Sequence, residues 1–495
     1  MEKNEFLQAI EKVSSFIVNY LETVGEKNVL PGVQPGYLTP LTEEECPKSG
    51  TDFEDIFTEF REKIMPGVTH WASPHFHAYF PAGNCYPSMV AELMMAGINN
   101  VGVNWEASPA MTELETVVLN WLGKMMNIPE EFLNSSDGHG GGVFQNTSTE
   151  STLLSCIAAR KATIDKWLQL RPNWSESQIS SKLTIYTSIQ SHSSVERVGS
   201  MTALITRIIP CNEEGKVTAE ILQSAIESDI AQGLIPCFYV ATMGATTTCS
   251  WDDLSEVGPV CEAHDVWMHV DAAYAGAALT CPELRYISNG LDYAKSFAVG
   301  LHKWFLMSFD VVAYWLKDTT ALSDVMYVDR VYLKHNHNKG IDFTHLQIGN
   351  GRKFKALKVW MTLKSFGVKG VQEHIRRSVM LGQYFEKLMT QDKRFRIATS
   401  GFGLVVFALK TGDEDTEELR RLINEDKKIM LTPAHYLNKY VIRFAVNHST
   451  RSEDVEFAWD VIRSTTNRME NTYKKSESVD VLIENVGDYL STIEI

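Results

Sequence analysis

The chain has 495 residues, of which 44% are hydrophobic and 22% charged, and its formal net charge is -16. This composition is typical of a globular protein with a large core, and the length favours two or three domains. The acidic charge argues against a nucleic-acid partner, because such proteins gather Lys and Arg on one face. No apolar run approaches the roughly 20 residues that cross a bilayer, so we expect a cytoplasmic protein without a membrane partner. Its eight scattered cysteines include no CxxC pair, which predicts reduced thiols and no metal site.

The first 85 residues are expected to form a helical arm. Apolar residues recur at alternating steps of four and three from Phe6 to Tyr20, a spacing typical of an amphipathic helix that needs a partner surface. A second helical pattern covers 52–63. The aromatic segment 71–80 contains a proline and is not expected to continue that helix.

Residues 86–360 are predicted to form a large α/β domain. Helical patterns at 111–126 and 152–170 alternate with short apolar, strand-like runs, which indicates a mainly parallel sheet covered on both faces. Strand-like runs flanked by helices also predict a smaller α+β domain over 361–470, and the polar, acidic segment 471–495 is interpreted as a tail. The runs expected as strands are 183–186, 237–241, 267–270, 311–315, 403–408 and 441–446.

A first motif in the large domain predicts a phosphate site. The glycine-rich segment 138–142 precedes Thr147, Ser148 and Thr149, which open a predicted helix. Glycines allow close backbone approach, and hydroxyl groups at a helix N-terminus favour an anion. The same residues also fit an ordinary helix cap.

Two further motifs follow in chain order. Asp271 ends an apolar strand, at the edge where open α/β sheets bind ligands, and could pair with a cationic ring nitrogen or merely cap a loop. Lys303 lies beside His302 among apolar neighbours, conditions that lower the pKa of an amine and favour imine formation, although most lysines are solvated. The order of these three features along the chain, a phosphate site followed by Asp271 and then Lys303, predicts that they form a single cofactor site.

Six segments carry a resemblance to a known family: Gly36–Leu38, His75–Pro81, Ser108–Glu115, His269–Gly276, His302–Trp304 and Tyr332–His335. With them the chain resembles the group II pyridoxal-phosphate decarboxylases, and within these the aromatic L-amino-acid decarboxylases, from about residue 33 to 450. The resemblance implies the aspartate-aminotransferase-like fold (fold type I), the cofactor pyridoxal 5'-phosphate, and a homodimer with a shared active site.

The resemblance also implies roles for single residues. Lys303 binds the cofactor as a Schiff base, Asp271 pairs with the ring nitrogen, and Ala273 and His192 lie on the two ring faces. Tyr332 closes over the site and protonates the carbon left by loss of CO2. Taken alone, a histidine such as His192 would more often be structural. The remaining predicted cofactor contacts are Thr147, Ser148, Thr149, Thr246 and His302, and the predicted substrate contacts are Trp71, Tyr79, Phe80, Pro81 and Ala82, whose aromatic members also fit a core role.

The implied activity is decarboxylation of an aromatic L-amino acid, such as DOPA, tyrosine, tryptophan, 5-hydroxytryptophan or phenylalanine, to its amine and CO2. In relatives that oxidise the substrate to an aldehyde, one of the positions of His192 and Tyr332 is typically changed, and this chain keeps both. An aromatic acetaldehyde synthase is therefore the first alternative. A histidine decarboxylase and a cofactor-binding protein without turnover are the others.

The chain departs from the family pattern near the expected site. Gly300 and Leu301 replace an Asn-Pro pair, which removes a side chain expected to contact the cofactor phosphate unless the region of Asn146 and Thr147 compensates. Ala82 and Val103 replace a Thr and a Phe, which predicts a roomier and less polar substrate pocket.

Overall fold

The computed structural model describes residues 1–134, 139–328 and 342–491, with side chains described as far as residue 472. Its contacts divide the chain into two compact units. Unit 1 comprises Met1–Tyr79, Gln383–Thr399 and Val405–Ile495, and unit 2 comprises Phe80–Gly382 and Ser400–Leu404. The predicted Tyr332 lies outside the described residues.

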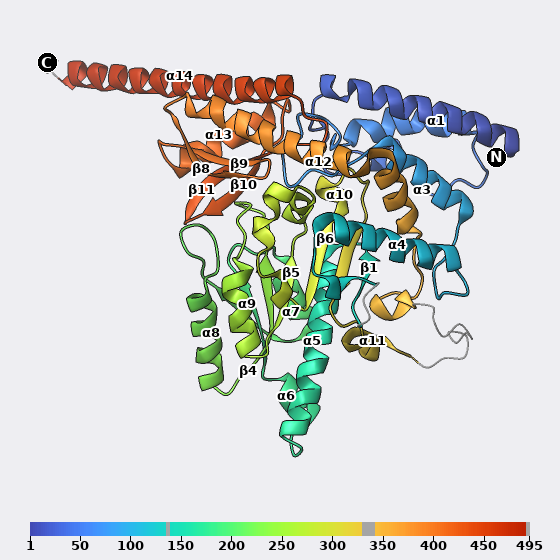
Figure 1. Ribbon diagram of the computed structural model, residues 1–495. Helices are drawn as coiled ribbons and strands as arrows, with labels where there is room; N and C mark the ends of the chain where they lie inside the picture. Colours follow the sequence, from blue (N-terminus) through green and yellow to red (C-terminus); the bar gives the residue numbers. More distant parts are fainter. Residues whose placement is uncertain (135–138, 329–341, 492–495) are drawn as a thin grey trace. The chain divides into compact units, whose positions relative to one another are not determined.

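Unit 2 is built around a seven-stranded sheet in the order β1-β7-β6-β5-β4-β2-β3 (Figure 1). Strands β2 to β6 pair in parallel, whereas β7 runs antiparallel to both β1 and β6. The central strands β4, β5 and β6 are almost entirely buried and mostly apolar, as expected for a parallel sheet covered by helices. The strands are β1 (Gly141–Gln145), β2 (Leu183–Ser188), β3 (Ile205–Ile209), β4 (Ile235–Thr242), β5 (Trp267–Asp271), β6 (Ser296–Gly300) and β7 (Val312–Leu316).

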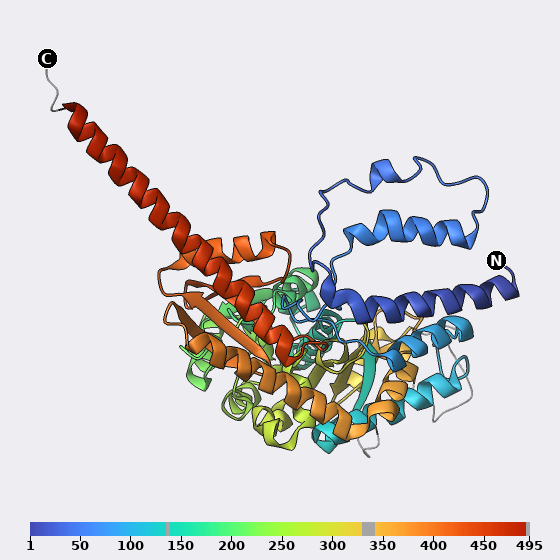
Figure 2. The same ribbon diagram turned by 90° about the horizontal axis from the view of Figure 1, so that it is seen from above.

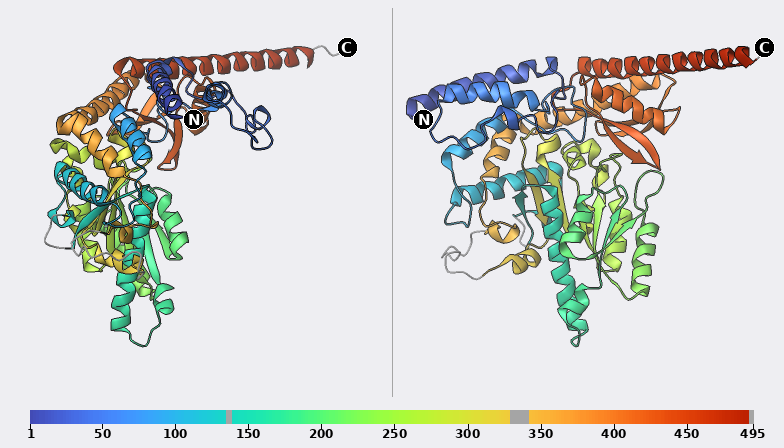
Figure 3. Two further views of the ribbon diagram at one scale, coloured as in Figure 1. Left: turned by 90° about the vertical axis from the view of Figure 1, so that its right-hand side faces the viewer. Right: turned by 180° about the vertical axis from the view of Figure 1, so that it is seen from behind.

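Helix α5 (Ser148–Leu170) packs along β1, β4, β5 and β6, helix α8 (Ala219–Ala231) packs on β3 and β4, and helix α9 (Leu254–Ala263) packs on β5 (Figure 3). The aliphatic core between α5 and the sheet includes Leu154, Ile185, Val240 and Val312. The other helices of unit 2 are α3 (Tyr86–Ile98), α4 (Pro109–Met126), α6 (Glu176–Ser180), α7 (Ser194–Thr202), α10 (Leu301–Trp304) and α11 (Thr320–Met326).

The glycine-rich segment was expected to form a loop around a phosphate, and this expectation is wrong for its described part. Gly141 and Gly142 lie in β1, where they allow close packing against neighbouring elements. A Cβ on Gly140 would lie 1.7 Å from the carbonyl oxygen of Glu131, and one on Gly142 would lie 2.6 Å from Trp315. The absence of side chains at these glycines therefore allows the edge strand β1 to pack closely against its neighbours.

Unit 1 contains the N-terminal helices and most of a second, antiparallel sheet, in the order β10-β11-β9-β8. The predicted helices are present as α1 (Lys3–Thr23) and α2 (Phe53–Glu59), with Phe16 of α1 packed edge-on against Phe57 of α2 at 5.5 Å. The strands are β8 (Phe395–Gly401), β9 (Leu404–Leu409), β10 (Thr432–Tyr436) and β11 (Lys439–Ala445), and α13 (Asp413–Glu425) packs on β11.

Two long helices complete the chain. Helix α12 (Lys355–Thr390) is interrupted at Gly367, whose φ of 61° lies outside the helical region. Helix α14 (Ser452–Ser491) continues through most of the segment that was interpreted as a tail (Figure 2). Within the described part of the chain, the search for a helix long and apolar enough to cross a membrane finds none.

Candidate active site

A cavity of about 220 Å³ opens in unit 2 at the carboxyl ends of the parallel strands. The loops that follow β2, β4, β5 and β6 meet there with the start of α5, because neighbouring parallel strands end at the same edge of the sheet. The lining residues are Phe80, Thr147, Ser148, Thr149, His192, Ser194, Thr242, Gly244, Thr246, Asp271, Ala273, Tyr274, His302 and Lys303. All of the cofactor contacts predicted from the sequence line this one cavity.

The hydroxyl group of Thr147 caps helix α5. Its Oγ1 accepts a hydrogen bond from the backbone N–H of Glu150 at 3.3 Å, and Ser148 and Thr149 follow in the first turn. The two interpretations of this motif are therefore compatible, because the capping residues also line the cavity. An α-helix of 23 residues directs its free N–H groups and partial positive charge to this point, which favours an anion.

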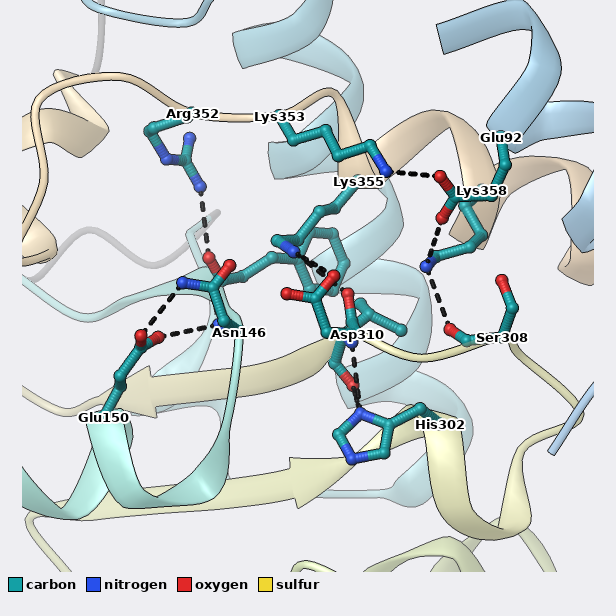
Figure 4. Close-up of polar contacts among 12 residues, drawn as sticks. Glu92, Asn146, Glu150, His302, Ser308, Asp310, Arg352, Lys353, Lys355 and Lys358 are labelled. Atoms are coloured by element: carbon teal, nitrogen blue, oxygen red, sulfur yellow. Dashed lines mark hydrogen bonds and ion pairs between the residues drawn. The ribbon is translucent and has the colours of Figure 1, made fainter. Parts of the chain in front are cut away.

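Asn146 does not supply the amide that a side chain at position 300 was expected to give. The Glu150 carboxylate accepts hydrogen bonds from the Asn146 backbone N–H at 2.9 Å and from its Nδ2 at 3.0 Å (Figure 4). Asn146 is thus engaged in capping α5, and it is not among the residues that line the cavity.

Asp271 is the last residue of β5, where it lines the cavity, and it is 8% exposed. Its Oδ1 accepts a hydrogen bond from the backbone N–H of Ala273 at 3.1 Å. The backbone around Ala273 is packed closely, because the N–H of Gly300 donates to the Ala273 carbonyl at 3.2 Å. A Cβ at position 300 would lie 2.5 Å from that carbonyl oxygen. The absence of a side chain at Gly300 therefore lets β6 approach the Asp271–Ala273 turn.

Lys303 lies in α10, directly after β6, and its side chain reaches the cavity. Its Nζ lies 5.6 Å from the ring centroid of Phe80, within the range of a cation–π contact. Phe80 stacks on Tyr274 at 3.6 Å, and Tyr274 stacks on Trp304 at 4.8 Å. These three rings form an apolar wall beside the amine.

The segment that follows Lys303 is held by buried charged groups. Lys358 Nζ donates to the Ser308 carbonyl at 2.9 Å and to Glu92 at 2.7 Å, and Lys355 Nζ donates to the Asp310 carbonyl at 3.0 Å (Figure 4). A buried ammonium is stable only when it is paired in this way. Sequence reasoning missed both lysines, because their only signal is an ordinary Lys spacing on a helix.

Burial lowers the pKa of His302 to about 4, and the charge of Lys303 acts in the same direction. His302 Nδ1 lies 2.9 Å from the Val311 carbonyl oxygen and 3.1 Å from the Val311 backbone nitrogen. His302 thus adds a neutral ring rather than a positive charge to the cavity.

His192 lies at the mouth of the cavity, between β2 and α7. Its Nδ1 accepts from the Ser194 N–H at 3.2 Å and contacts the Ser194 hydroxyl at 2.9 Å, an arrangement that leaves Nε2 to carry the proton. Desolvation by the surrounding protein lowers the pKa of His192; the charge of Asp271 opposes this shift and that of Lys303 adds to it. A neutral ring near pH 7 follows.

The predicted substrate contacts are divided between the two units. Trp71 and Tyr79 belong to unit 1, where their rings stack at 5.5 Å, and they are 42% and 49% exposed, so neither is a core residue. Phe80 belongs to unit 2 and lines the cavity. Pro81 and Ala82 also belong to unit 2 but are not among the residues that line the cavity.

The residues around the cavity fit pyridoxal phosphate in their chemistry. Hydroxyl groups at a helix N-terminus suit the phosphate, a carboxylate suits a protonated ring nitrogen, and a primary amine suits the aldehyde carbon. Gly244 contributes a close backbone approach at the cavity wall, with a φ of 92° and no room for a Cβ, which would lie 2.6 Å from Ala275.

Comparisons with known proteins agree with this chemistry. The pyridoxal-dependent decarboxylase conserved domain matches residues 35–410. The aromatic-L-amino-acid decarboxylase of Cavia porcellus is 44% identical over 468 residues, which cover 94% of this chain and 98% of that protein. The 3,4-dihydroxyphenylacetaldehyde synthase of Aedes aegypti is 40% identical over 94% of this chain and 90% of that protein.

Solved structures agree as well. The structure of Oryza sativa TDC with PLP and tryptamine is 32% identical and covers 95% of this chain and 99% of its own, with a TM-score of 0.91. The family, the fold class and the cofactor expected from the sequence are confirmed. This chain belongs to the family of pyridoxal-dependent decarboxylases.

Proposed function

We propose that this protein decarboxylates an aromatic L-amino acid to the corresponding amine and CO2. The observation that carries the proposal is the single cavity in which the hydroxyl groups of α5, the carboxylate of Asp271 and the amine of Lys303 meet. The aromatic-L-amino-acid decarboxylases that this chain resembles at 44% identity support the substrate class.

The residues of the chain divide the work. Thr147, Ser148 and Thr149 would hold the phosphate, Asp271 would keep the ring nitrogen protonated, and Lys303 would attach the cofactor through its amine. When bound, pyridoxal phosphate accepts the electron pair that is left when the carboxylate departs from Cα. His192 would cover one face of the ring and exclude water, and Ala273 would support the other.

Returning a proton to Cα requires an acid at the mouth of the site. Tyr332 has this role in the proposal on the strength of the family resemblance. A phenol is neutral near pH 7 and can donate its proton to a carbanion, so amine release would follow without an oxidant.

An aromatic substrate suits the cavity wall formed by Phe80 and Tyr274, with Trp304 stacked on Tyr274. Aromatic rings gain about 0.5 to 1.5 kcal/mol from stacked or edge-on contacts beyond their burial. Among the described residues that line the cavity, Lys303 is the only Lys or Arg, which disfavours a substrate with a second carboxylate. Trp71 and Tyr79 are proposed to contribute further aromatic contacts.

The second candidate is an aromatic acetaldehyde synthase, favoured by the 40% identity to the Aedes aegypti enzyme. Purified protein should be loaded with cofactor and incubated with phenylalanine, tyrosine, DOPA, tryptophan, 5-hydroxytryptophan and histidine, while CO2, amine, aldehyde and peroxide are measured. The proposal predicts equal yields of CO2 and amine from aromatic substrates. Aldehyde with peroxide would assign the second candidate, turnover of histidine alone would assign a histidine decarboxylase, and binding without CO2 would exclude all three.

We further propose a cytoplasmic homodimer. Helix α3 of unit 2 presents Val90, Leu93, Met94 and Ile98 at 44–55% exposure, an apolar face that suits a second copy of the chain. All eight cysteines are free thiols, as suits a reducing compartment. Sedimentation equilibrium tests the dimer, and a Leu93→Lys and Met94→Lys double variant should be monomeric.

A further inference from the structure

A buried histidine lies behind the cavity and is not one of its lining residues. His269 is on β5, two residues before Asp271, and is 0% exposed. Residues two apart on a strand point to the same face, so His269 and Asp271 both face α5. The side chain of His269 contacts Thr152 and Ser155 of α5, which confirms this direction.

The hydrogen bonds around His269 fix its tautomer. Trp267 Nε1 donates to Ser296 Oγ at 2.9 Å, and an indole can only donate. Ser296 Oγ lies 2.9 Å and Ser155 Oγ 3.2 Å from His269 Nδ1. On the other side of the ring the Thr152 hydroxyl gives its proton to the Ser148 carbonyl, so it can only accept from His269, and the neutral ring carries its proton on Nε2.

The opposite side of the ring leads to the phosphate end of the cavity. His269 Nε2 contacts Thr152 Oγ1 at 3.5 Å, and the Thr152 hydroxyl donates to the carbonyl of Ser148 at 3.0 Å. Ser148 lines the cavity at the start of α5. A continuous series of hydrogen bonds therefore runs from Trp267 and Ser296 through His269 to the first turn of α5.

Burial determines the charge of this ring. Desolvation lowers the pKa of His269 to about 4, although the negative charge of Asp271 opposes the shift. The ring is neutral near pH 7, so it gives Asp271 no competing cation, and the carboxylate remains available for a positive charge in the cavity. Ser155, which bonds both His269 and the Tyr314 hydroxyl, adds a link to β7.

We infer that His269 is a positioning residue that fixes the first turn of α5 relative to Asp271. These two elements would hold the two ends of one rigid cofactor, the phosphate and the ring nitrogen, so their separation must match its length. The inference rests on the proposed cofactor site and concerns a residue that does not touch the cofactor. It assigns the connection to the first turn of α5 to the Nε2 side of the ring, through Thr152, whereas Nδ1 contacts Ser155 farther along the helix.

Replacing His269 by Gln or by Asn tests the Nε2 side and the Nδ1 side of the ring separately. Gln at position 269 can place an N–H donor where His269 Nε2 lies, whereas Asn is too short and can only replace the Nδ1 acceptor. Loss of one buried hydrogen bond corresponds to about a tenfold change in an equilibrium constant. We therefore expect His269→Asn to weaken cofactor binding by about tenfold and His269→Gln by roughly threefold or less.

The measurement is titration of the cofactor-free protein with pyridoxal phosphate, followed by the visible absorbance band, together with thermal unfolding of the same samples. Tyr186→Phe is the matched control, because it removes a buried hydroxyl that bonds Asp229 at 3.0 Å, on β2 and away from the cavity lining. It should lower the melting temperature and leave the dissociation constant unchanged. Thr152→Val, which removes one hydroxyl at nearly constant volume, should weaken binding as His269→Asn does.

If the wild-type protein binds pyridoxal phosphate and His269→Asn and Thr152→Val bind it equally tightly, the inference about His269 is wrong and the proposed function is unaffected. Equal weakening in His269→Asn and His269→Gln would also overturn it, because the Nε2 side would then have no special role. A wild-type protein that binds no cofactor would overturn both this inference and the proposed function.

Discussion

Restoring the family's Asn at position 300 is predicted to weaken cofactor binding in this chain, because Gly300 leaves no room for a side chain. A Cβ at this position would lie 2.5 Å from the carbonyl oxygen of Ala273. Carbon–oxygen contacts are normally about 3.3 Å or longer, so Gly300→Ala requires a shift of roughly 0.8 Å in backbone atoms. Because Ala273 lines the cavity, the shift would move the surface on which we propose that the cofactor ring lies.

The expected cost is that of overpacking a buried site, about 1 to 3 kcal/mol of unfolding free energy. The Gly300 N–H bond to Ala273 would be strained together with the bond from the Ala273 N–H to Asp271. Gly300→Asn introduces the same Cβ, so the family's own residue should also weaken cofactor binding in this chain.

Thermal unfolding and cofactor titration of both variants test this reasoning. Gly401→Ala is the matched control, because a Cβ there meets no atom within 4 Å. We expect the control to behave as wild type and both Gly300 variants to lose stability and affinity. Tighter cofactor binding by Gly300→Asn would refute the reasoning, since it would show that the backbone leaves room for the amide.

Three other predictions concern Lys303, Tyr332 and two buried histidines. Lys303→Ala should abolish the visible band of the protein-bound cofactor and all turnover, and an active variant would contradict the role of Lys303. Tyr332→Phe should shift the product from amine toward aldehyde, as measured by chromatography, and an unchanged product ratio would remove Tyr332 from the proton return. Burial lowers the folded-state pKa of His269 and of His302 from 6.5 to about 4, so both contribute stability that is present above pH 6.5 and is lost as the pH falls toward 4. Protonation of each histidine would lower the unfolding free energy by roughly 3 kcal/mol across this window. A melting temperature of the cofactor-free protein that stays constant from pH 6.5 to pH 4 would contradict this prediction.

Much of the site could be predicted because local patterns and sheet geometry agree. Strands β5 and β6 are short, mostly apolar runs; Asp271 is the last residue of β5, and Lys303 lies in α10, three residues after the end of β6. Parallel neighbours end at one edge of the sheet, so these groups and the start of α5 had to lie close together. The order of the motifs along the chain was therefore enough to predict that the start of α5, Asp271 and Lys303 line one cavity.

Other features depend on contacts that no local pattern contains. Strand β1 was missed because its glycines suggest a loop, and their fit against Trp315 is visible only when β7 is in place. The buried Lys358 is explained by Glu92, which is 266 residues away in sequence. Helix α14 extends into the predicted tail because helical backbone does not require an apolar face.

Gly300 and His269 show the same limit at the site itself. The sequence identifies Gly300 as a missing side chain, but its close approach to Ala273 follows from the pairing of β5 with β6. His269 is only part of a motif until Trp267, Ser296 and Thr152 are placed around it.

The central claim is that CO2 is lost and a proton returns to the same carbon. The most direct measurement is turnover of an aromatic L-amino acid by the cofactor-loaded protein in D2O, with mass spectrometry of the product. The account predicts an amine with one deuterium bound to the carbon that carried the carboxylate, formed in equal amount with CO2. An aldehyde formed with consumption of O2, or an absence of CO2, would contradict it.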